Sequence, residues 1–405
     1  MIAHPGLRFT DHTVTVPLDH SDAGQGTIEV FAREVVASDK AGDDLPWLLY
    51  LQGGPGGKSP RPLRSGSWIA RAVKTHRVLL LDQRGTGRST PLTPSMAGSV
   101  KHFRADSIVA DCEILRARLA GGQRWDTLGQ SYGGFVTMTY LSHAPHGVRT
   151  AYVTGGLPGL TATADEVYAR TYPRVAAKNA EYYRAFPQDR AKVRAIADRL
   201  AAEDVRLPDG DRLTVERFRT LGSAFGMSYG YAQVHWLLDE AFSDSFRYEV
   251  MQLTGFVGQP LYALQEYIYG QGPGATNWAA DRALAARPEF AADAGPLLFT
   301  GEMMYPWMFE QIRALRPYAG AAAELAAAGD WPLLYDPTIL AANEVPVYAA
   351  VYADDMYVDM GLSLETAAAV GNVRTWITNE HEHDGLRTSG EDVLGHLMDM
   401  AAFTR

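Results

Sequence analysis

The sequence predicts an α/β protein in which a mostly parallel sheet carries helices on both faces and a large helical cap domain is inserted into the core. Short apolar runs that end in Gly-rich turns alternate with helical patterns from residue 47 to residue 154. Strand patterns then nearly vanish, and they return at residues 345–351 and 373–378. A β-α-β-α-β series implies parallel strands with helices on both faces, and the late return of strands implies an insertion.

Each element of the core has a local signal. Buried parallel strands read as short apolar runs, whereas helices show a 3.6-residue period and stop before proline. These signals predict strands at 47–51 and 77–81, a strand ending at Leu128 and another at 150–154, and helices at 67–74, 107–119, 132–142 and 362–370. Residues 28–36 look like an antiparallel edge strand before this series.

The segment after Gly155-Gly156-Leu157-Pro158 is dominated by helical patterns rich in Ala, Arg, Tyr and Trp. We therefore expect a catalytic core formed by residues 1–156 and 341–405 and a helical cap domain at 157–340. The Ala-rich run 319–328 predicts a plain surface helix.

Composition narrows the class of protein. Of 405 residues, 46% are hydrophobic and 21% charged, and no apolar run has the length of a bilayer span, so we expect a globular protein without a membrane partner. The formal net charge of −10 argues against nucleic acid and favours a neutral or cationic small substrate. The single cysteine, Cys112, excludes an internal disulfide and fits a half-buried helix position. Because the first ten residues lack a signal-peptide pattern, we expect a cytoplasmic location.

The pattern that carries chemistry is Gly129-Gln130-Ser131-Tyr132-Gly133-Gly134, between a predicted strand and a predicted helix. In the α/β-hydrolase fold this G-x-S-x-G turn strains the backbone and holds the serine hydroxyl out over the sheet. The helix that follows favours negative charge at its first amides. The sequence therefore predicts Ser131 as a nucleophile.

A serine nucleophile needs a base and an orienting acid, which follow it in this fold in the order Ser, acid, His. The acid is expected after the strand at 345–351, where we prefer Asp355 to Asp354 and Asp359. The base is expected after the strand at 373–378, where we prefer His383 to His381. Both loops follow the carboxyl ends of strands, where ligands bind in open α/β sheets.

Two other segments resemble binding motifs. His381-Glu382-His383 with Asp384 brings metal-binding residue types together, but no other segment has matched spacing, so neither metal nor cofactor is expected. The stretch Gly53–Ser59 superficially resembles a phosphate loop. It lacks the required spacer, and Pro55 has no N–H for a phosphate.

Gly53-Gly54-Pro55-Gly56-Gly57 fits an oxyanion-stabilising turn better, because glycines allow close backbone approach and proline stiffens the turn. We predict that the N–H groups of Gly54 and Tyr132 form the oxyanion hole.

Three motifs together resemble the proline iminopeptidases (prolyl aminopeptidases) of the α/β-hydrolase serine peptidases, in particular the longer bacterial branch. They are Gln52–Gly57, Asp82-Gln83-Arg84-Gly85-Thr86-Gly87-Arg88-Ser89, and the turn around Ser131. The resemblance covers roughly residues 25–160 and 340–395. It implies release of N-terminal proline from peptides, with the catalytic roles on Ser131, Asp355 and His383. The family's usual His before the glycine pair is Gln52 here.

An aminopeptidase must also bind a charged secondary amine, which requires acidic groups. The resemblance implies cap glutamates for this role, with Glu266 and Glu302 as the amine anchors. Glu240 is a further acidic candidate in the cap, and Tyr229, Tyr267 and Trp307 are candidates for the walls of a proline pocket. We expect Arg84 and Arg88 to hold a surface loop through an Arg–Asp pair.

Two hypotheses compete with a peptidase. An esterase, lactonase or amide hydrolase acting on a small metabolite would use the same triad without an amine to bind. A non-catalytic ligand-binding protein would use the fold alone. The expected partner is a peptide or small molecule with a free N-terminal proline, and the sequence leaves a homo-oligomer open.

Overall fold

The structure is a computed structural model that describes residues 2–62 and 66–403, and it divides into two compact units. The first unit draws on Met1–Thr161, Pro332–Ala353 and Met360–Arg405, and the second on Ala162–Trp331 and Asp354–Asp359. These divisions differ from the predicted boundaries after residues 156 and 340.

The difference has a physical reason, because the segments that flank the insertion pack on the core. The carbonyl oxygen of Leu157 accepts a hydrogen bond from Ser363 Oγ at 3.0 Å. On the other side, the Asp336 N–H donates to Ser142 Oγ at 3.1 Å.

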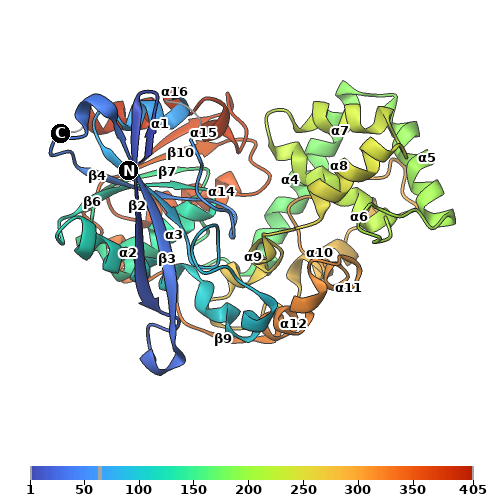
Figure 1. The fold of residues 1–405 in the computed structure, drawn as a ribbon. Coiled ribbons are helices and arrows are strands. Elements are labelled where there is room, and N and C mark those ends of the chain that lie inside the picture. The colour runs from blue at the N-terminus through green and yellow to red at the C-terminus, as the bar shows by residue number, and fades with distance from the viewer. Residues whose placement is uncertain (1, 63–65, 404–405) are drawn as a thin grey trace. The chain divides into compact units, whose positions relative to one another are not determined.

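In the described part of the chain, the first unit contains a nine-stranded sheet with the order β1-β2-β3-β5-β4-β6-β7-β10-β11 (Figure 1). The strands are β1 (Ile2–His4), β2 (Leu7–Pro17), β3 (Thr27–Ala37), β4 (Trp47–Leu51), β5 (Arg77–Asp82), β6 (Trp125–Gln130), β7 (Val148–Thr154), β10 (Val347–Tyr352) and β11 (Val373–Thr378). From β5 to β11 every neighbouring pair is parallel, which confirms the predicted parallel sheet.

The prediction of an edge strand at 28–36 is wrong. Strand β3 pairs antiparallel with β5 on one side and with β2 on the other. Strands β2 and β3 form a long hairpin, seen in blue in Figure 1, which the sequence analysis did not anticipate. Its first strand alternates buried and exposed residues instead of forming an apolar run, so it lacks the signal used for the other strands.

Helices cover both faces of the sheet, as predicted (Figure 1). The helices of this unit are α1 (Ser67–Ala72), α2 (Ala105–Leu119), α3 (Tyr132–His143), α13 (Pro337–Ala341), α14 (Met360–Ala369), α15 (Gly385–Thr388) and α16 (Gly390–Phe403). On one face, Trp68 of α1 and Leu394 and Leu397 of α16 join sheet residues such as Leu80 and Leu128 in one buried apolar cluster. Helices α2 and α3 pack on the other face.

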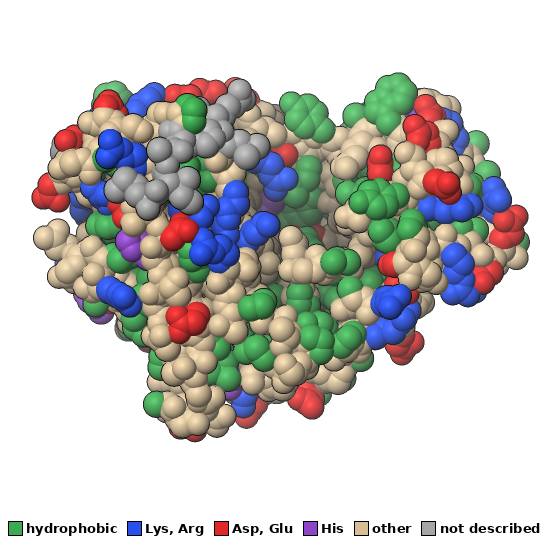
Figure 2. All heavy atoms as spheres, viewed as in Figure 1, with side chains coloured by type: hydrophobic (Ala, Val, Ile, Leu, Met, Phe, Trp, Pro, Cys, Tyr) green, Lys and Arg blue, Asp and Glu red, His purple; other side chains and the backbone are tan. Residues whose placement is uncertain are grey.

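The second unit is almost entirely helical. It contains α4 (Ala164–Ala185), α5 (Asp189–Ala202), α6 (Val215–Arg219), α7 (Gly230–Asp239), α8 (Asp244–Thr254), α9 (Pro260–Ala263), α10 (Ala279–Ala285), α11 (Met308–Gln311) and α12 (Ala319–Ala327), with the short strands β8 (Gly272–Pro273) and β9 (Asp330–Trp331). Helix α4 begins with a capping box in which Thr163 and Glu166 exchange side-chain and backbone hydrogen bonds. Acidic and basic side chains both reach the face of this unit shown in Figure 2.

Two smaller expectations need correction. Helix α12 buries Ala321, Ala322, Leu325 and Ala326, so the Ala-rich run is amphipathic and packs its small side chains inward. Cys112 is fully buried, not half-buried, because it faces the core from α2. Within residues 2–62 and 66–403, no helix has the length and apolar character needed to cross a membrane.

Candidate active site

Ser131 occupies a sharp turn between the end of β6 and the start of α3. Its backbone lies at φ 54° and ψ −123°, a conformation that non-glycine residues rarely adopt. The Ser131 N–H donates to the carbonyl oxygen of Thr154 at 3.0 Å, and its own carbonyl oxygen accepts from Gly134 at 2.7 Å. A strained backbone held by neighbouring strands is what the nucleophile turn of this fold requires.

Glycines around this turn are required by close backbone packing. A Cβ atom on Gly133 would lie 1.9 Å from the carbonyl oxygen of Leu51, and one on Gly134 would lie 2.2 Å from that of Gly156. A Cβ atom on Gly156 would lie 2.4 Å from the carbonyl oxygen of Ser131. Each distance is far below a normal contact, so β4, β7 and α3 can converge on Ser131 only with glycine at these positions.

The glycine-rich loop after β4 lies directly against the serine. A Cβ atom on Gly53 would lie 2.9 Å from Ser131 Cβ and 2.5 Å from Gln130 Oε1. Gly54 follows at φ 126° and precedes a cis peptide bond to Pro55. The loop in which the oxyanion hole was predicted is therefore brought to the predicted nucleophile.

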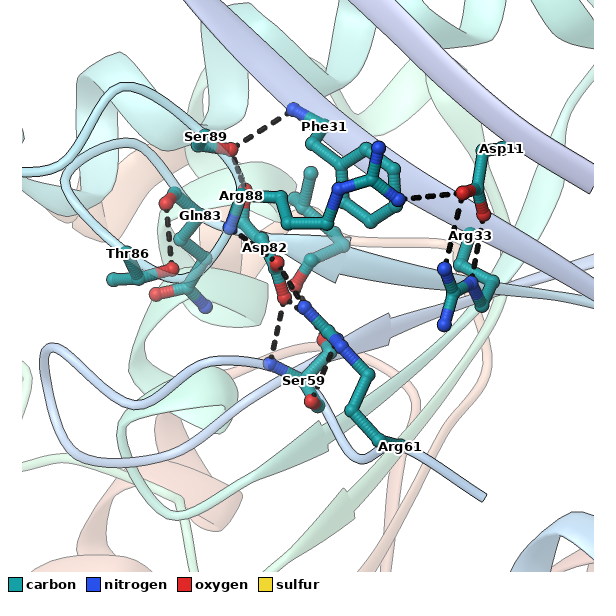
Figure 3. A network of polar contacts seen from close by, with 11 residues as sticks. Asp11, Phe31, Arg33, Ser59, Arg61, Asp82, Gln83, Thr86, Arg88 and Ser89 are labelled. Carbon is teal, nitrogen blue, oxygen red and sulfur yellow. Dashed lines mark hydrogen bonds and ion pairs between the residues drawn. The ribbon is translucent and has the colours of Figure 1, made fainter. Parts of the chain in front are cut away.

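A buried carboxylate at the end of β5 holds this loop (Figure 3). Asp82 is fully buried, and its Oδ1 accepts from the Ser59 N–H and from Arg61 Nη1, both at 3.0 Å. Its Oδ2 accepts from the Arg88 N–H at 2.8 Å and from Arg61 Nη2. Next to it, Gln83 Nε2 donates to the carbonyl oxygen of Gln52 at 3.0 Å.

These contacts give the Asp82–Ser89 motif a structural role that its sequence alone does not reveal. The motif ties both ends of the glycine-rich loop to the sheet, one through Gln52 and the other through Ser59 and Arg61. An acidic residue at the end of an otherwise apolar strand was the signal in the sequence. Its partners could not be identified there, because Ser59 and Arg61 lie more than twenty residues earlier in the chain.

The expectation that Arg84 holds a surface loop is wrong in one respect. Arg84 is buried, and its Nε and Nη2 bond to Asp111 Oδ2 and Oδ1 at 2.7 and 2.6 Å. Its Nη1 also donates to the carbonyl oxygens of Leu18 and His102, both at 2.7 Å. The Arg–Asp pair is present, but it joins segments in the interior, since a buried guanidinium needs acceptors for its donors.

His383 is buried at the carboxyl end of the sheet, in the turn after β11. A Cβ atom on Gly155 would lie 3.2 Å from His383 Nδ1, and the next residue, Gly156, contacts Ser131 as described above. Consecutive glycines after β7 thus contact the predicted base and the predicted nucleophile. His381 instead packs its ring edge-on against Trp376, with centroids 5.9 Å apart.

The three candidate acids differ in environment. Asp355 is buried, and its Oδ1 accepts from the N–H groups of Tyr357 and Val358 at 2.8 and 3.0 Å. Asp354 is half exposed and pairs with Arg174 at 3.1 Å. Asp359 is intermediate in burial. Because they lie in the segment Asp354–Asp359, all three belong to the second unit.

In the second unit, Glu266 lies in the short 3-10 helix Gln265–Tyr269, and its buried carboxylate reaches the start of α10. Its Oε2 accepts from Thr276 Oγ1 at 2.7 Å and from the Trp278 N–H at 2.9 Å, and its Oε1 accepts from the Ala280 N–H at 3.4 Å. Burial raises the pKa of Glu266, although these hydrogen bonds act in the opposite direction. The carboxylate therefore serves as an acceptor for a helix start.

Glu302 has a different environment. It is half-buried, and its Oε1 accepts a hydrogen bond from the hydroxyl of Tyr262. Burial, and next the nearby charge of Glu302, raise the pKa of Tyr262 well above its ordinary value, so Tyr262 remains a hydrogen-bond donor.

The other residues named in the cap differ in exposure. Tyr229 is 74% exposed, and Glu240 is also exposed. Tyr267 is buried, whereas Trp307 is half-buried and stacks on Tyr305 with centroids 5.9 Å apart.

Comparison with known proteins agrees with this geometry. Residues 46–223 match the family model described as the alpha/beta hydrolase fold, which confirms the predicted fold class. The chain is 46% identical over 410 residues to a proline iminopeptidase of Aeromonas sobria, covering 97% of this chain and 96% of that protein. It is 34% identical over 422 residues to a proline iminopeptidase of Aspergillus aculeatus, covering 97% of this chain and 94% of the relative. The chain therefore belongs to the proline iminopeptidase family.

Proposed function

We propose that this protein releases N-terminal proline from peptides by acyl transfer to Ser131. The observation that carries the proposal is the strained Ser131 turn, against which the glycine loop at Gly53 packs and beside which Gly155 contacts His383. The chain is 46% and 34% identical to two proline iminopeptidases over 97% of its length, and this similarity supports proline as the residue released.

The reaction begins when Ser131 Oγ attacks the carbonyl carbon of the N-terminal proline and His383 takes the hydroxyl proton. Backbone N–H groups of Gly54 and Tyr132 stabilise the oxyanion that forms, and the loss of one such donor typically lowers kcat ~10²–10³-fold. The C–N bond then breaks as His383 gives its proton to the leaving nitrogen. Water, activated by His383, attacks the prolyl ester and releases proline from Ser131.

We assign the orienting role to Asp355. The N–H groups of Tyr357 and Val358 fix the orientation of the Asp355 carboxylate. Because Asp355 is buried, water does not compete with a histidine for hydrogen bonds to this carboxylate. Asp354, in contrast, is engaged at the surface by Arg174.

For the secondary amine of the substrate we favour Glu302 over Glu266. Glu302 is half-buried, so its carboxylate stays within reach of a cationic group of the substrate, and its charge would strengthen a hydrogen bond to that group. The oxygens of Glu266 already accept from three donors of its own unit, so we assign it to stabilising the start of α10.

The test is hydrolysis of L-prolyl 4-nitroanilide by the purified protein and by Ser131→Ala. We expect turnover by the wild type, none by Ser131→Ala, and loss of fluorophosphonate labelling in the variant. Ser95→Ala, at an exposed serine, is the matched control and should behave as the wild type. Turnover of neutral esters without turnover of the prolyl anilide would overturn the proposal in favour of an esterase.

A further inference from the structure

The first unit contains a cavity of about 360 Å³ beside the candidate active site. Its walls include Tyr50, Gln52, Trp68, Gln130, Asp384 and Arg387. Tyr50 and Trp68 stack with ring centroids 4.5 Å apart and form an aromatic wall, while the amides and the charged groups make the remainder polar. This volume is at the small end of ligand-binding pockets, which suits one amino-acid residue.

The cavity is lined by the sequence neighbours of both predicted catalytic residues, Gln130 beside Ser131 and Asp384 beside His383. Gln130 directly precedes Ser131 and lines the cavity. Its side chain packs against the glycine-rich loop, because a Cβ atom on Gly53 would lie 2.5 Å from Gln130 Oε1. Asp384 directly follows His383. Since the histidine must protonate the leaving nitrogen, the leaving group has to lie next to His383, and the wall formed by Asp384 and Arg387 continues from there.

The charges on this wall match the ends of an amino acid. Arg387 is exposed, and its side chain forms no ion pair with a carboxylate in residues 2–62 and 66–403. Arg387 lines the cavity together with Tyr50. Burial raises the pKa of the Tyr50 hydroxyl, and the positive charge of Arg387 opposes that rise. Asp384 is buried and lies at the start of α15, one helical turn before Arg387. A negative group next to His383 is therefore followed along the wall by a positive group.

We propose that this cavity is the subsite for the residue released after proline, and that Arg387 pairs with the free carboxylate of that residue. The preferred substrates are then prolyl dipeptides with an unblocked C-terminus. The inference rests on the proposed function. When the C–N bond breaks, His383 supplies one proton and the leaving residue gains an amine; Asp384 faces that amine as it takes up a second proton from water, and Arg387 holds the carboxylate.

The experiment compares three substrates, of which the first two differ only in the C-terminal charge and the third has no amino-acid residue after proline. These are L-prolyl-L-alanine, its C-terminal amide, and L-prolyl 4-nitroanilide. We expect the wild type to hydrolyse the free dipeptide with a kcat/KM about tenfold above that of the amide, and this advantage to shrink as ionic strength rises. Arg387→Gln should lose about tenfold on the dipeptide and change by less than about twofold on the other two substrates.

Two variants keep the result interpretable. Arg387→Lys retains the charge and should recover part of the dipeptide activity. Arg374→Gln removes an exposed arginine of β11 and should leave all three substrates unchanged. Melting temperatures of all variants establish that the fold is intact.

Each outcome decides the matter. If the wild type hydrolyses the anilide but does not distinguish dipeptide from amide, the subsite assignment is overturned while the proposed function stands. An equal loss by Arg387→Gln on dipeptide and amide would likewise overturn the carboxylate pairing. If the wild type hydrolyses none of the three, the proposed function fails and the subsite fails with it.

Discussion

Gly133 of α3 lies so close to Leu51 of β4 that a Cβ atom on the glycine would be 1.9 Å from the leucine carbonyl oxygen. Neither backbone can yield without moving the Ser131 turn. We predict that Gly133→Ala destabilises the protein by about 3 kcal/mol or more and abolishes activity. Thermal and urea unfolding measure the loss of stability.

Gly98→Ala, where nothing lies within 4 Å of the added Cβ, is the control and should be nearly neutral. Normal stability and activity of Gly133→Ala would contradict this packing.

Asp82→Asn should act on catalysis through the glycine-rich loop. The amide replaces one acceptor oxygen by a donor that faces the N–H groups of Ser59, Arg61 or Arg88. Because a displacement of about 1 Å at a reacting centre can cost ~10²-fold in rate, we expect kcat to fall by about 10–100-fold. The rate of fluorophosphonate labelling of Ser131 should fall in parallel.

The matched control is Asp11→Asn. Asp11 pairs with Arg33 at 2.7 Å and with Arg88 at 2.5 Å near the surface, so its loss should cost less than about 1 kcal/mol and leave kcat unchanged. A lower melting temperature of Asp82→Asn with an unchanged labelling rate would limit Asp82 to a role in stability.

Glu266→Ala should destabilise the helical unit without a specific effect on substrate binding. It leaves the Thr276 hydroxyl and the Trp278 N–H without their acceptor in the interior, which costs about 1–3 kcal/mol. Urea unfolding monitored by tryptophan fluorescence measures this loss. Glu324→Ala, an exposed position on α12, should change stability little. A stable Glu266→Ala with a strongly raised KM would return the amine-binding role to Glu266.

Glu302→Gln, unlike Glu266→Ala, should weaken substrate binding and leave stability nearly unchanged. Glutamine keeps an acceptor for the Tyr262 hydroxyl, so the melting temperature should stay within a few degrees of the wild type. The lost charge should raise KM for L-prolyl 4-nitroanilide by about tenfold or more, since a charge-assisted hydrogen bond to the amine is removed. Steady-state kinetics with Glu302→Asp as the charge-retaining variant provide the comparison. An unchanged KM would remove Glu302 from substrate recognition.

Stability should fall in acid as the buried Asp126 is protonated. Burial alone would raise the pKa of Asp126, but hydrogen bonds from Arg149 at 2.6 and 2.8 Å and from His76 at 2.9 Å outweigh it and lower the pKa. A carboxylate whose pKa is lower in the folded state stabilises the fold above its unfolded pKa, near 3.9, and loses this contribution as the pH falls below that value.

Asp126→Asn tests this sign. At neutral pH the variant should be less stable by about 3 kcal/mol, because Arg149 loses its counter-ion. The difference in unfolding free energy between wild type and variant should shrink as the pH is lowered through about 4. A difference that stays constant from neutral pH to pH 3 would show that the ionised carboxylate is not the stabilising group.

Much of the first unit was predictable because its signals are local. The strands at 47–51 and 373–378 were predicted with the bounds that the structure shows. Each is a run of strand-forming residues closed by turn residues, and the strand and helix around Ser131 have equally strong boundaries. Strand β2 was missed because its residues alternate between buried and exposed positions and form no continuous apolar run, the signal that marks the parallel strands.

The candidate catalytic residues also fall into those that local sequence indicates and those that tertiary packing distinguishes. The choice of Ser131 depends on a turn whose residues are adjacent in sequence. The distinction between His383 and His381 depends on packing, since His381 is held against Trp376 while Nδ1 of His383 lies beside Gly155. Likewise, Asp354 and Asp355 are neighbours in the chain and differ only in what surrounds them.

By itself the sequence determined the parallel part of the sheet and the strained serine turn, because backbone sterics and hydrophobic periodicity act over a few residues. Only the tertiary structure decided that Asp82 anchors the glycine loop, that Arg84 is buried on Asp111, that Glu266 supports α10, and that Arg387 faces a cavity. Burial and hydrogen bonding set the energy of a charged group, and both depend on partners far away in the chain.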